Sequence, residues 1–236
     1  MQLSTLAWLS ESQNRIFGRR LQTACDELGL DLTEAPDPDQ ADLVYLCGLP
    51  ASRMLRTHRP LLAPVLAAPR YQGQPWYFVD VVARDADLGL GAGRWAYNQP
   101  DSFSGWLAVR HGLRLHHLDP DAIEWIATGS HAASLDAIRT EAADQAGIDS
   151  MILDLDSATV SRLVVLDSWG PWPTPPVMVS RRLDHGFVRD LSETVLGTDR
   201  DVNWVAIDPG HLDPISAVAQ PALGPTEQIR STPTSC

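Results

Sequence analysis

The stretch Tyr97–Trp106, which reads Tyr-Asn-Gln-Pro-Asp-Ser-Phe-Ser-Gly-Trp, runs from a predicted strand through a hydroxyl-rich turn into a predicted helix. The first N–H groups of a helix have no acceptor within that helix, and they lie at the positive end of the helix dipole. Serine hydroxyls beside them complete a set of donors that suits a phosphate-like oxyanion. The stretch therefore predicts an anion-binding turn formed by Ser102, Phe103, Ser104 and Gly105.

A second turn of the same kind follows the apolar run at residues 123–126. It reads Thr-Gly-Ser-His over residues 128–131 and leads into a helical pattern at 132–143. Ser130 and His131 begin that helix, where an imidazole N–H adds a donor for an anion. Because each turn leads into a helix, we expect the two helix starts to converge on one ligand.

Each of these residues also has a purely structural explanation. Serine is among the preferred residues at a helix N-cap, so Ser102, Ser104 and Ser130 are also explained as caps. Gly105 favours the ligand interpretation, since a residue without a side chain lets a ligand approach the backbone closely. His131 favours it too, because a ring donor after a capping serine has no capping purpose.

Two further polar residues, Asp149 and Ser150, follow a predicted strand. A carboxylate such as that of Asp149 accepts a hydrogen bond from a ligand O–H and rejects a fully deprotonated anion, so it would tune selectivity. The alternative is that Asp149 caps the helix behind it. Tyr45 and Tyr77 are candidates for the walls of a ligand cleft, although aromatic residues on strands usually belong to the core.

The composition limits the partners of the chain. Its 236 residues carry a formal net charge of −12, and 44% of them are hydrophobic, which is typical of a folded domain. Proteins bind nucleic acids and anionic membrane surfaces through basic patches on their own surface, so neither is an expected partner of this acidic chain. A small anion held locally by amides and hydroxyls remains compatible with this charge.

Several catalytic chemistries are excluded or unsupported. All 18 basic residues are arginine, which rules out lysine-based Schiff-base and P-loop chemistry. The three cysteines are widely spaced, and neither they nor His111, His116 and His117 form a recognisable metal-ligand pattern. No nucleophile–base pair is evident. We therefore predict no catalytic residue, no metal and no cofactor.

Hydrophobic periodicity predicts an α/β protein in which strands and helices alternate. The predicted strands are 3–9, 30–33, 43–47, 61–67, 76–83, 94–97, 123–128, 146–152, 163–166 and 177–180, and the predicted helices are 13–28, 106–113, 132–143, 157–162 and 184–196. The proline-rich segment 169–176 is interpreted as a stiff connector, and the tail 221–236 as frayed.

The region from Trp76 to Leu183 resembles the PhnD-like phosphate and phosphonate substrate-binding proteins of ABC transporters, which have the type II periplasmic-binding-protein fold. The segments that carry the resemblance are Tyr77–Arg84, Arg94–Asn98, Asp101–Gly105, Thr128–His131, Gly147–Ser150 and Pro175–Ser180. A weaker likeness, at Ala41–Gly48, extends to the strand and loop of the first lobe.

The resemblance implies two lobes, each a mixed sheet flanked by helices and joined by a two-strand hinge. Lobe I would comprise residues 1–75 and 172–236, and lobe II residues 76–171. The ligand would lie between them and be captured by hinge closure. A monomer that passes its ligand to an ABC permease, with no insertion into the membrane, is the implied arrangement.

The expected function is therefore non-enzymatic capture of phosphate, phosphite or a phosphonate. Two alternatives stay open. One is a cytosolic enzyme or sensor of the same fold that binds a small organic metabolite, and the other is an interaction subunit that has lost ligand binding. The sequence as written shows no secretion-signal pattern, which predicts a cytoplasmic location, whereas the transport role implies an extracytoplasmic one.

Overall fold

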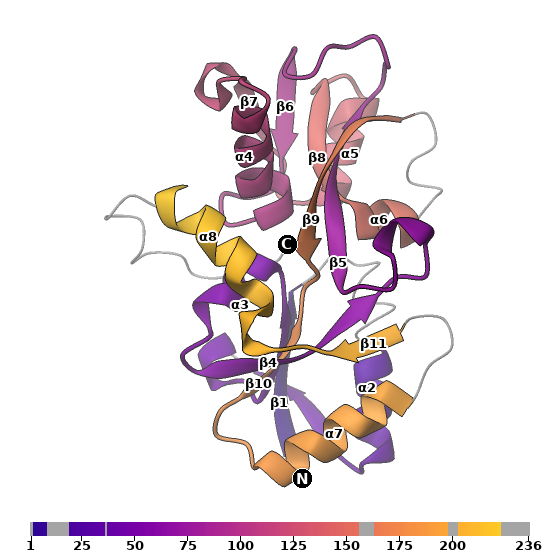
Figure 1. Cartoon of the computed structure of the whole chain (residues 1–236), viewed down its shortest axis with the longest axis vertical. Coiled ribbons are helices and arrows are strands. Elements are labelled where there is room, and N and C mark those ends of the chain that lie inside the picture. The colour runs from indigo at the N-terminus through magenta and orange to yellow at the C-terminus, as the bar shows by residue number, and fades with distance from the viewer. Residues whose placement is uncertain (1, 9–18, 36, 156–162, 198–202, 223–236) are drawn as a thin grey trace. The chain divides into compact units, whose positions relative to one another are not determined.

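The chain forms two compact units, each with its own sheet. The structure, a computed structural model, describes residues 2–8, 19–35, 37–155, 163–197 and 203–222 (Figure 1). Unit 1 comprises Met1–Trp76 and Pro173–Pro214, and unit 2 comprises Tyr77–Trp172 and Ile215–Cys236. The predicted α/β class, with a mixed sheet flanked by helices in each part, is confirmed.

Unit 1 contains a six-stranded sheet in the order β11-β4-β10-β3-β1-β2. The strands are Gln2–Trp8 (β1), Asp31–Glu34 (β2), Leu43–Leu46 (β3), His58–Val65 (β4), Val177–Ser180 (β10) and Asn203–Ala206 (β11). β1 runs parallel to β2 and β3, whereas β10 is antiparallel to β3 and β4. Its α-helices are Arg19–Glu27 (α2), Gly48–Arg53 (α3) and His185–Gly197 (α7), and its short 3₁₀ turns are Pro38–Gln40, Pro69–Tyr71 and Pro209–Leu212.

Unit 2 contains a five-stranded sheet in the order β7-β6-β8-β5-β9. The strands are Trp76–Ala83 (β5), Arg94–Tyr97 (β6), Glu124–Ala127 (β7), Gln145–Asp149 (β8) and Val164–Pro173 (β9). The helices are Phe103–Leu107 (η4, a π-helix), Ala108–Leu115 (α4), His131–Arg139 (α5) and Ser150–Leu155 (α6), with a 3₁₀ turn at Pro120–Ala122; Asp213–Ala222 (α8) crosses the unit boundary. β6 is parallel to β7 and β8, and β5 is antiparallel to β8.

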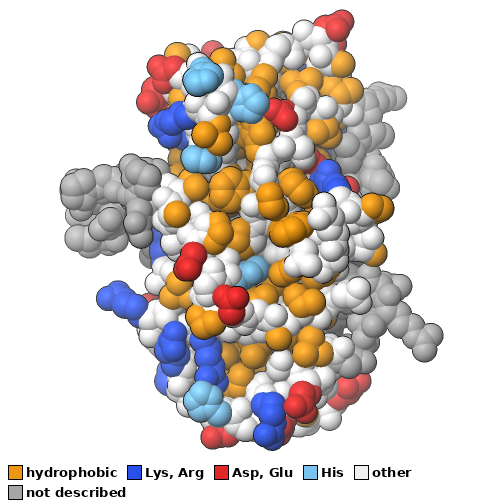
Figure 2. Space-filling model, viewed as in Figure 1, with side chains coloured by type: hydrophobic (Ala, Val, Ile, Leu, Met, Phe, Trp, Pro, Cys, Tyr) orange, Lys and Arg blue, Asp and Glu red, His pale blue; other side chains and the backbone are white. Residues whose placement is uncertain are grey.

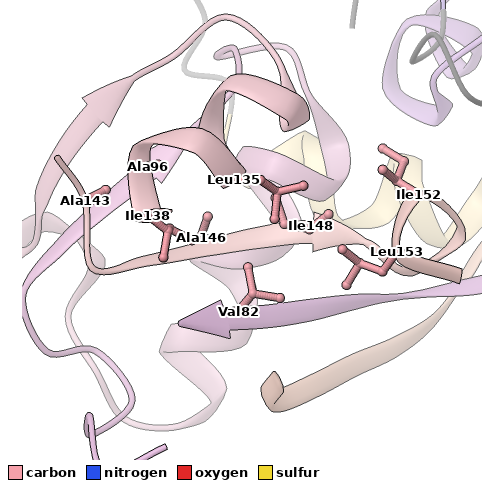
Figure 3. Close-up of a cluster of buried hydrophobic side chains, with 9 residues drawn as sticks. All are labelled: Val82, Ala96, Leu135, Ile138, Ala143, Ala146, Ile148, Ile152 and Leu153. Atoms are coloured by element: carbon pink, nitrogen blue, oxygen red, sulfur yellow. The ribbon is translucent and has the colours of Figure 1, made fainter. Parts of the chain in front are cut away.

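α5 is fixed to one face of the unit 2 sheet by a buried apolar cluster (Figure 3). Leu135 and Ile138 of α5 pack against side chains from three strands and from α6, namely Val82, Ala96, Ala146, Ile148, Ile152 and Leu153, together with Ala143. This packing holds the start of α5, and with it the second predicted turn, in a defined position above the sheet.

The helix that begins at the first predicted turn covers the opposite face. Ala146 and Ile148 belong to the cluster under α5, and Gly147 between them points to the other side because side chains alternate along a strand. A Cβ atom on Gly147 would lie 2.1 Å from Cγ2 of Val109 in α4 and 3.3 Å from the Ser104 carbonyl oxygen. Gly147 therefore lets η4 and α4 pack directly on β8.

Several predicted elements differ from the observed ones. The strand predicted at 146–152 ends at Asp149, because Ser150–Leu155 turns into α6. The segment 169–176 is not only a connector, since β9 continues through the tryptophans to Pro173. The tail predicted to be frayed from 221 contributes two residues to α8. α3, α8 and β11 were not predicted.

Other predictions fall partly or wholly outside the described residues. The helix predicted at 157–162, the first part of the helix predicted at 13–28, and residues 223–236 of the tail are among them. Within the described residues, no helix combines the length and apolar character needed to cross a membrane.

The close approach at Gly147 gives a stability test. Gly147→Ala places a methyl group 2.1 Å from the Val109 side chain. We therefore expect the free energy of unfolding, measured in urea, to fall by about 1–3 kcal/mol. Gly89→Ala is the matched control, because a Cβ there meets no atom within 4 Å, and its stability should change by less than about 0.5 kcal/mol. Equal effects of the two substitutions would contradict the packing described.

Candidate functional site

The two predicted turns lie side by side in unit 2. β6 and β7 are parallel neighbours, so their carboxyl ends meet at the same edge of the sheet, and one turn follows each strand. Two backbone hydrogen bonds join the turns: Thr128 N–H donates to the Tyr97 carbonyl oxygen and Gly129 N–H donates to that of Asn98, both at 2.9 Å. In open α/β sheets this edge, between helices on opposite faces, is where ligands bind.

The side chains of the two turns meet through Ser104 and His131. Ser104 Oγ lies 2.9 Å from His131 Nε2, and both residues are buried, with exposed fractions of 6% and 5%. Ser104 comes from the first turn of the helix formed by η4 and α4, and His131 is the first residue of α5. The structure thus brings together one predicted donor from each turn.

The Ser104–His131 pair retains an unused donor in either tautomer of the ring. A neutral imidazole and a hydroxyl carry one hydrogen each, and the bond between them uses one of these hydrogens. If Ser104 donates to Nε2, the hydrogen that remains is on Nδ1 of His131, which is buried and has no hydrogen-bond partner among the described residues. If Nε2 donates instead, the hydroxyl hydrogen of Ser104 remains.

Burial keeps the His131 ring uncharged at neutral pH. Desolvation lowers the pKa of His131 from 6.5 to about 4. An uncharged ring still donates a hydrogen bond, and its lack of charge agrees with a site built from neutral groups at two helix starts.

Ser102 and Ser130 occupy the N-cap positions. Ser102 Oγ accepts from Gly105 N–H at 3.1 Å, and Ser130 Oγ accepts from Ala133 N–H at 3.1 Å. The capping interpretation therefore holds for both, and the Gly105 amide is used by the cap. Each hydroxyl still carries a hydrogen of its own, so capping does not remove these residues as donors.

Phe103 lies at the same helix start, but its ring is part of the core. The side chain is 1% exposed, and its ring packs edge-on against Trp172, with 4.9 Å between ring centroids. The N–H groups of Phe103 and Ser104, as the first of their helix, have no acceptor within the helix. Any contribution of Phe103 to an anion site would come from its backbone.

Asp149 and Ser150 also have structural roles at the start of α6. Asp149 Oδ1 accepts from Met151 N–H at 2.8 Å, as in the capping alternative. Ser150 Oγ accepts from Phe78 N–H at 2.9 Å, which ties α6 to β5. Tyr77, next to Phe78, is buried with 3% exposure. The ligand roles predicted for these three residues stay predictions.

Tyr45 belongs to the core of unit 1. It is 1% exposed on β3, and its ring packs against Trp204 of β11 with 6.0 Å between centroids. Its predicted role as a cleft wall likewise stays a prediction.

His111 in α4 and His116 just after it pack against tryptophans of β9. Figure 2 shows histidine side chains gathered on the surface of unit 2 over α4. His116 Nε2 lies 3.3 Å from Asp167 Oδ2, and its ring is 5.5 Å from that of Trp169, while His111 packs edge-on against Trp172. Among the described residues, no group of three or more His, Cys, Asp or Glu side chains is arranged to hold a metal ion.

Sequence reasoning missed Asn98 as a site residue. Its side chain is 2% exposed, and neither amide atom has a hydrogen-bond partner among the described residues. A Cβ on Gly105 would lie 1.9 Å from Asn98 Oδ1, so the space expected for a ligand at this glycine holds the Asn98 side chain. The signal in the sequence was the position of Asn98 at the end of β6, directly before the turn.

The shifted pKa of His131 predicts a pH-dependent stability. Between pH 6.5 and about 4 the unfolded chain binds a proton at this ring that the folded chain does not, so stability falls as pH falls. The full effect is about 3 kcal/mol, since one pKa unit is worth about 1.4 kcal/mol. Between about pH 7 and about pH 5, the free energy of unfolding in urea should fall by about 2 kcal/mol less in His131→Gln than in the wild type.

The matched control for this measurement is His117→Asn. His117 is exposed and has a φ of 59°, a backbone conformation that asparagine tolerates. The slope of stability against pH should match the wild type in this variant. An equal slope in His131→Gln would show that His131 is not buried in its neutral form.

Several solved structures resemble this chain over more than nine-tenths of its length. PhnD1 from Prochlorococcus marinus in complex with methylphosphonate has a TM-score of 0.75 and 14% identity, covering 94% of this chain and 98% of that one. A binding protein component of an ABC phosphonate transporter from Pseudomonas aeruginosa has a TM-score of 0.69 and 16% identity, covering 92% and 85%.

A Xanthomonas citri protein bound to ATP has a TM-score of 0.67 and 16% identity, covering 93% of this chain and 97% of that one. At these identities the likeness establishes the periplasmic-binding-protein fold. The search of curated proteins finds no match.

The sequence family described as "ABC transporter, phosphonate, periplasmic substrate-binding protein" matches residues 30–217, which is most of the chain. This family consists of transporter binding proteins and not of enzymes, in agreement with the prediction of a non-enzymatic protein. The chain belongs to the family of periplasmic substrate-binding proteins of phosphonate ABC transporters.

Proposed function

We propose that the chain binds a small phosphorus oxyanion, such as phosphate, phosphite or a phosphonate, at the two helix starts of unit 2. The observation that carries this proposal is the buried bond between Ser104 and His131, which joins both turns and leaves one donor hydrogen unused. The backbone N–H groups at the same helix starts supply further donors.

The electrostatics of this site suit a small anion in an acidic protein. The chain has a net charge of −12, so its long-range field repels anions. Hydrogen bonds from neutral groups act at short range and are strengthened when donor and acceptor are shielded from water. Ser104 and His131 are both more than nine-tenths buried, which provides that shielding.

Family membership and the methylphosphonate complex of the Prochlorococcus relative support a phosphonate or a close analogue as the ligand. In that role the protein would deliver its ligand to an ABC permease.

The hinge closure implied by the resemblance stays a prediction. It would be tested by small-angle X-ray scattering, in which adding methylphosphonate should lower the radius of gyration.

A sensor for a phosphorylated metabolite is the second candidate. The observation that favours it is the relative solved with ATP, which shares the fold and matches this chain over 97% of its own length. The same donors would then hold a phosphate group of a larger molecule. Binding of ATP in preference to all small oxyanions would support the sensor over the transporter component.

The test is isothermal titration calorimetry with methylphosphonate, phosphite, phosphate, sulfate and ATP. We expect Ser104→Ala and His131→Ala each to weaken binding of the preferred phosphorus oxyanion by about 5- to 100-fold, because each breaks the buried hydrogen bond that holds the remaining donor in position. Melting temperatures without ligand would verify that both variants fold.

Thr140→Ala is the matched control for these variants. Thr140 lies at the opposite end of α5, where its hydroxyl donates to the Asp136 carbonyl oxygen at 2.8 Å. Its affinity should equal that of the wild type. Unchanged affinity in both Ser104→Ala and His131→Ala would show that the anion binds elsewhere.

A further inference from the structure

The carboxamide of Asn98 is a buried polar group that the proposed function does not use. The side chain is 2% exposed, and both Nδ2 and Oδ1 lack a hydrogen-bond partner among the described residues. Native proteins leave few buried polar atoms without a partner, because each such atom has given up its bonds to water. A carboxamide with both atoms in this state therefore points to a partner from outside the chain.

Asn98 lies where the two turns of the candidate site meet. Its carbonyl oxygen accepts from Gly129 N–H in the second turn at 2.9 Å. Its side chain lies against Gly105 in the first turn, where a Cβ would be 1.9 Å from Oδ1 and 3.1 Å from Nδ2. The Asn98 backbone makes this link, and Gln99 Nε2 adds another by donating to the Gly129 carbonyl oxygen at 3.0 Å, so the Asn98 carboxamide is not needed for it.

The turn against which the Asn98 side chain lies carries donors already assigned to the anion. Gly105 follows Ser104, whose hydroxyl bonds to His131, and Gly105 N–H bonds to the capping Ser102. The absence of a side chain at Gly105 places the carboxamide directly against the backbone of this turn.

We propose that Asn98 is a further ligand-binding residue that selects a protonated phosphorus oxyanion. Its Nδ2 donates to a ligand oxygen, and its Oδ1 accepts from a ligand O–H. A ligand that satisfies both atoms must offer an acceptor and a donor together. Phosphate and phosphonates retain an acidic hydrogen in part of their population near neutral pH, whereas sulfate has none. This inference rests on the proposed function and adds the basis of its selectivity.

The test compares Asn98→Ala and Asn98→Asp with the wild type by calorimetry, using methylphosphonate, inorganic phosphate and sulfate as probes. Asn98→Ala should weaken methylphosphonate and phosphate binding by about tenfold or more and change sulfate binding less, so that selectivity against sulfate falls. Asn98→Asp keeps the shape of the side chain and replaces its amide donor with a negative charge, so it should weaken the binding of all three probes.

Two controls separate a ligand contact from a structural role. Asn203→Ala changes an exposed asparagine in unit 1 and should leave all affinities unchanged. Because the Asn98 carboxamide makes no internal hydrogen bond to the described residues, the neutral variant Asn98→Ala should also melt within a few degrees of the wild type when no ligand is present.

The outcomes distinguish this inference from the proposed function. If the wild type binds a phosphorus oxyanion and Ser104→Ala weakens it, but both Asn98 variants bind as tightly as the wild type, the assignment of Asn98 is overturned and the function stands. If Asn98→Ala weakens the binding of methylphosphonate and phosphate only as much as it weakens the binding of sulfate, the proposed selectivity is overturned. If the wild type binds none of the probes, function and inference fail together.

Discussion

The candidate site depends on the parallel pairing of β6 with β7. This pairing places the two strand ends together, and each strand end leads into a helix whose first N–H groups have no acceptor within the helix. The helices pack on opposite faces of the sheet, α5 over Ala146 and Ile148 and α4 at Gly147. At this edge the two helix starts approach each other, and Ser104 forms a hydrogen bond with His131 there.

The two side chains that meet at the candidate site, Ser104 and His131, are buried and uncharged. Burial of His131 lowers its pKa to about 4, so the ring takes part in the Ser104 bond without a charge. A charged group here would have to be desolvated at a high free-energy cost, whereas a neutral ring and a hydroxyl incur a smaller one. In the proposed function, recognition of the anion therefore rests on helix starts and hydrogen bonds and requires no basic residue in a chain of net charge −12.

The sequence allowed the fold and both turns to be predicted, but not the contacts between them. β5, β6 and β10 have the predicted bounds, because each is a mostly apolar segment limited by turn or loop residues. The helix at Ser150 was missed, since the apolar residues 151–153 continue the pattern of the preceding strand without a visible break. The Ser104–His131 bond and the burial of Asn98 depend on strand pairing and on side-chain packing, which one sequence does not specify.

Capping and the proposed ligand binding are compatible explanations of these two turns. The Ser102 hydroxyl accepts from Gly105 N–H and so fixes the turn. With the turn fixed, the missing side chain at Gly105 leaves room for the Asn98 carboxamide at a position where any Cβ would clash with it. The same turn holds the Ser104 hydroxyl against His131. The cap at Ser102 thus helps to determine which polar groups lie together at the candidate site.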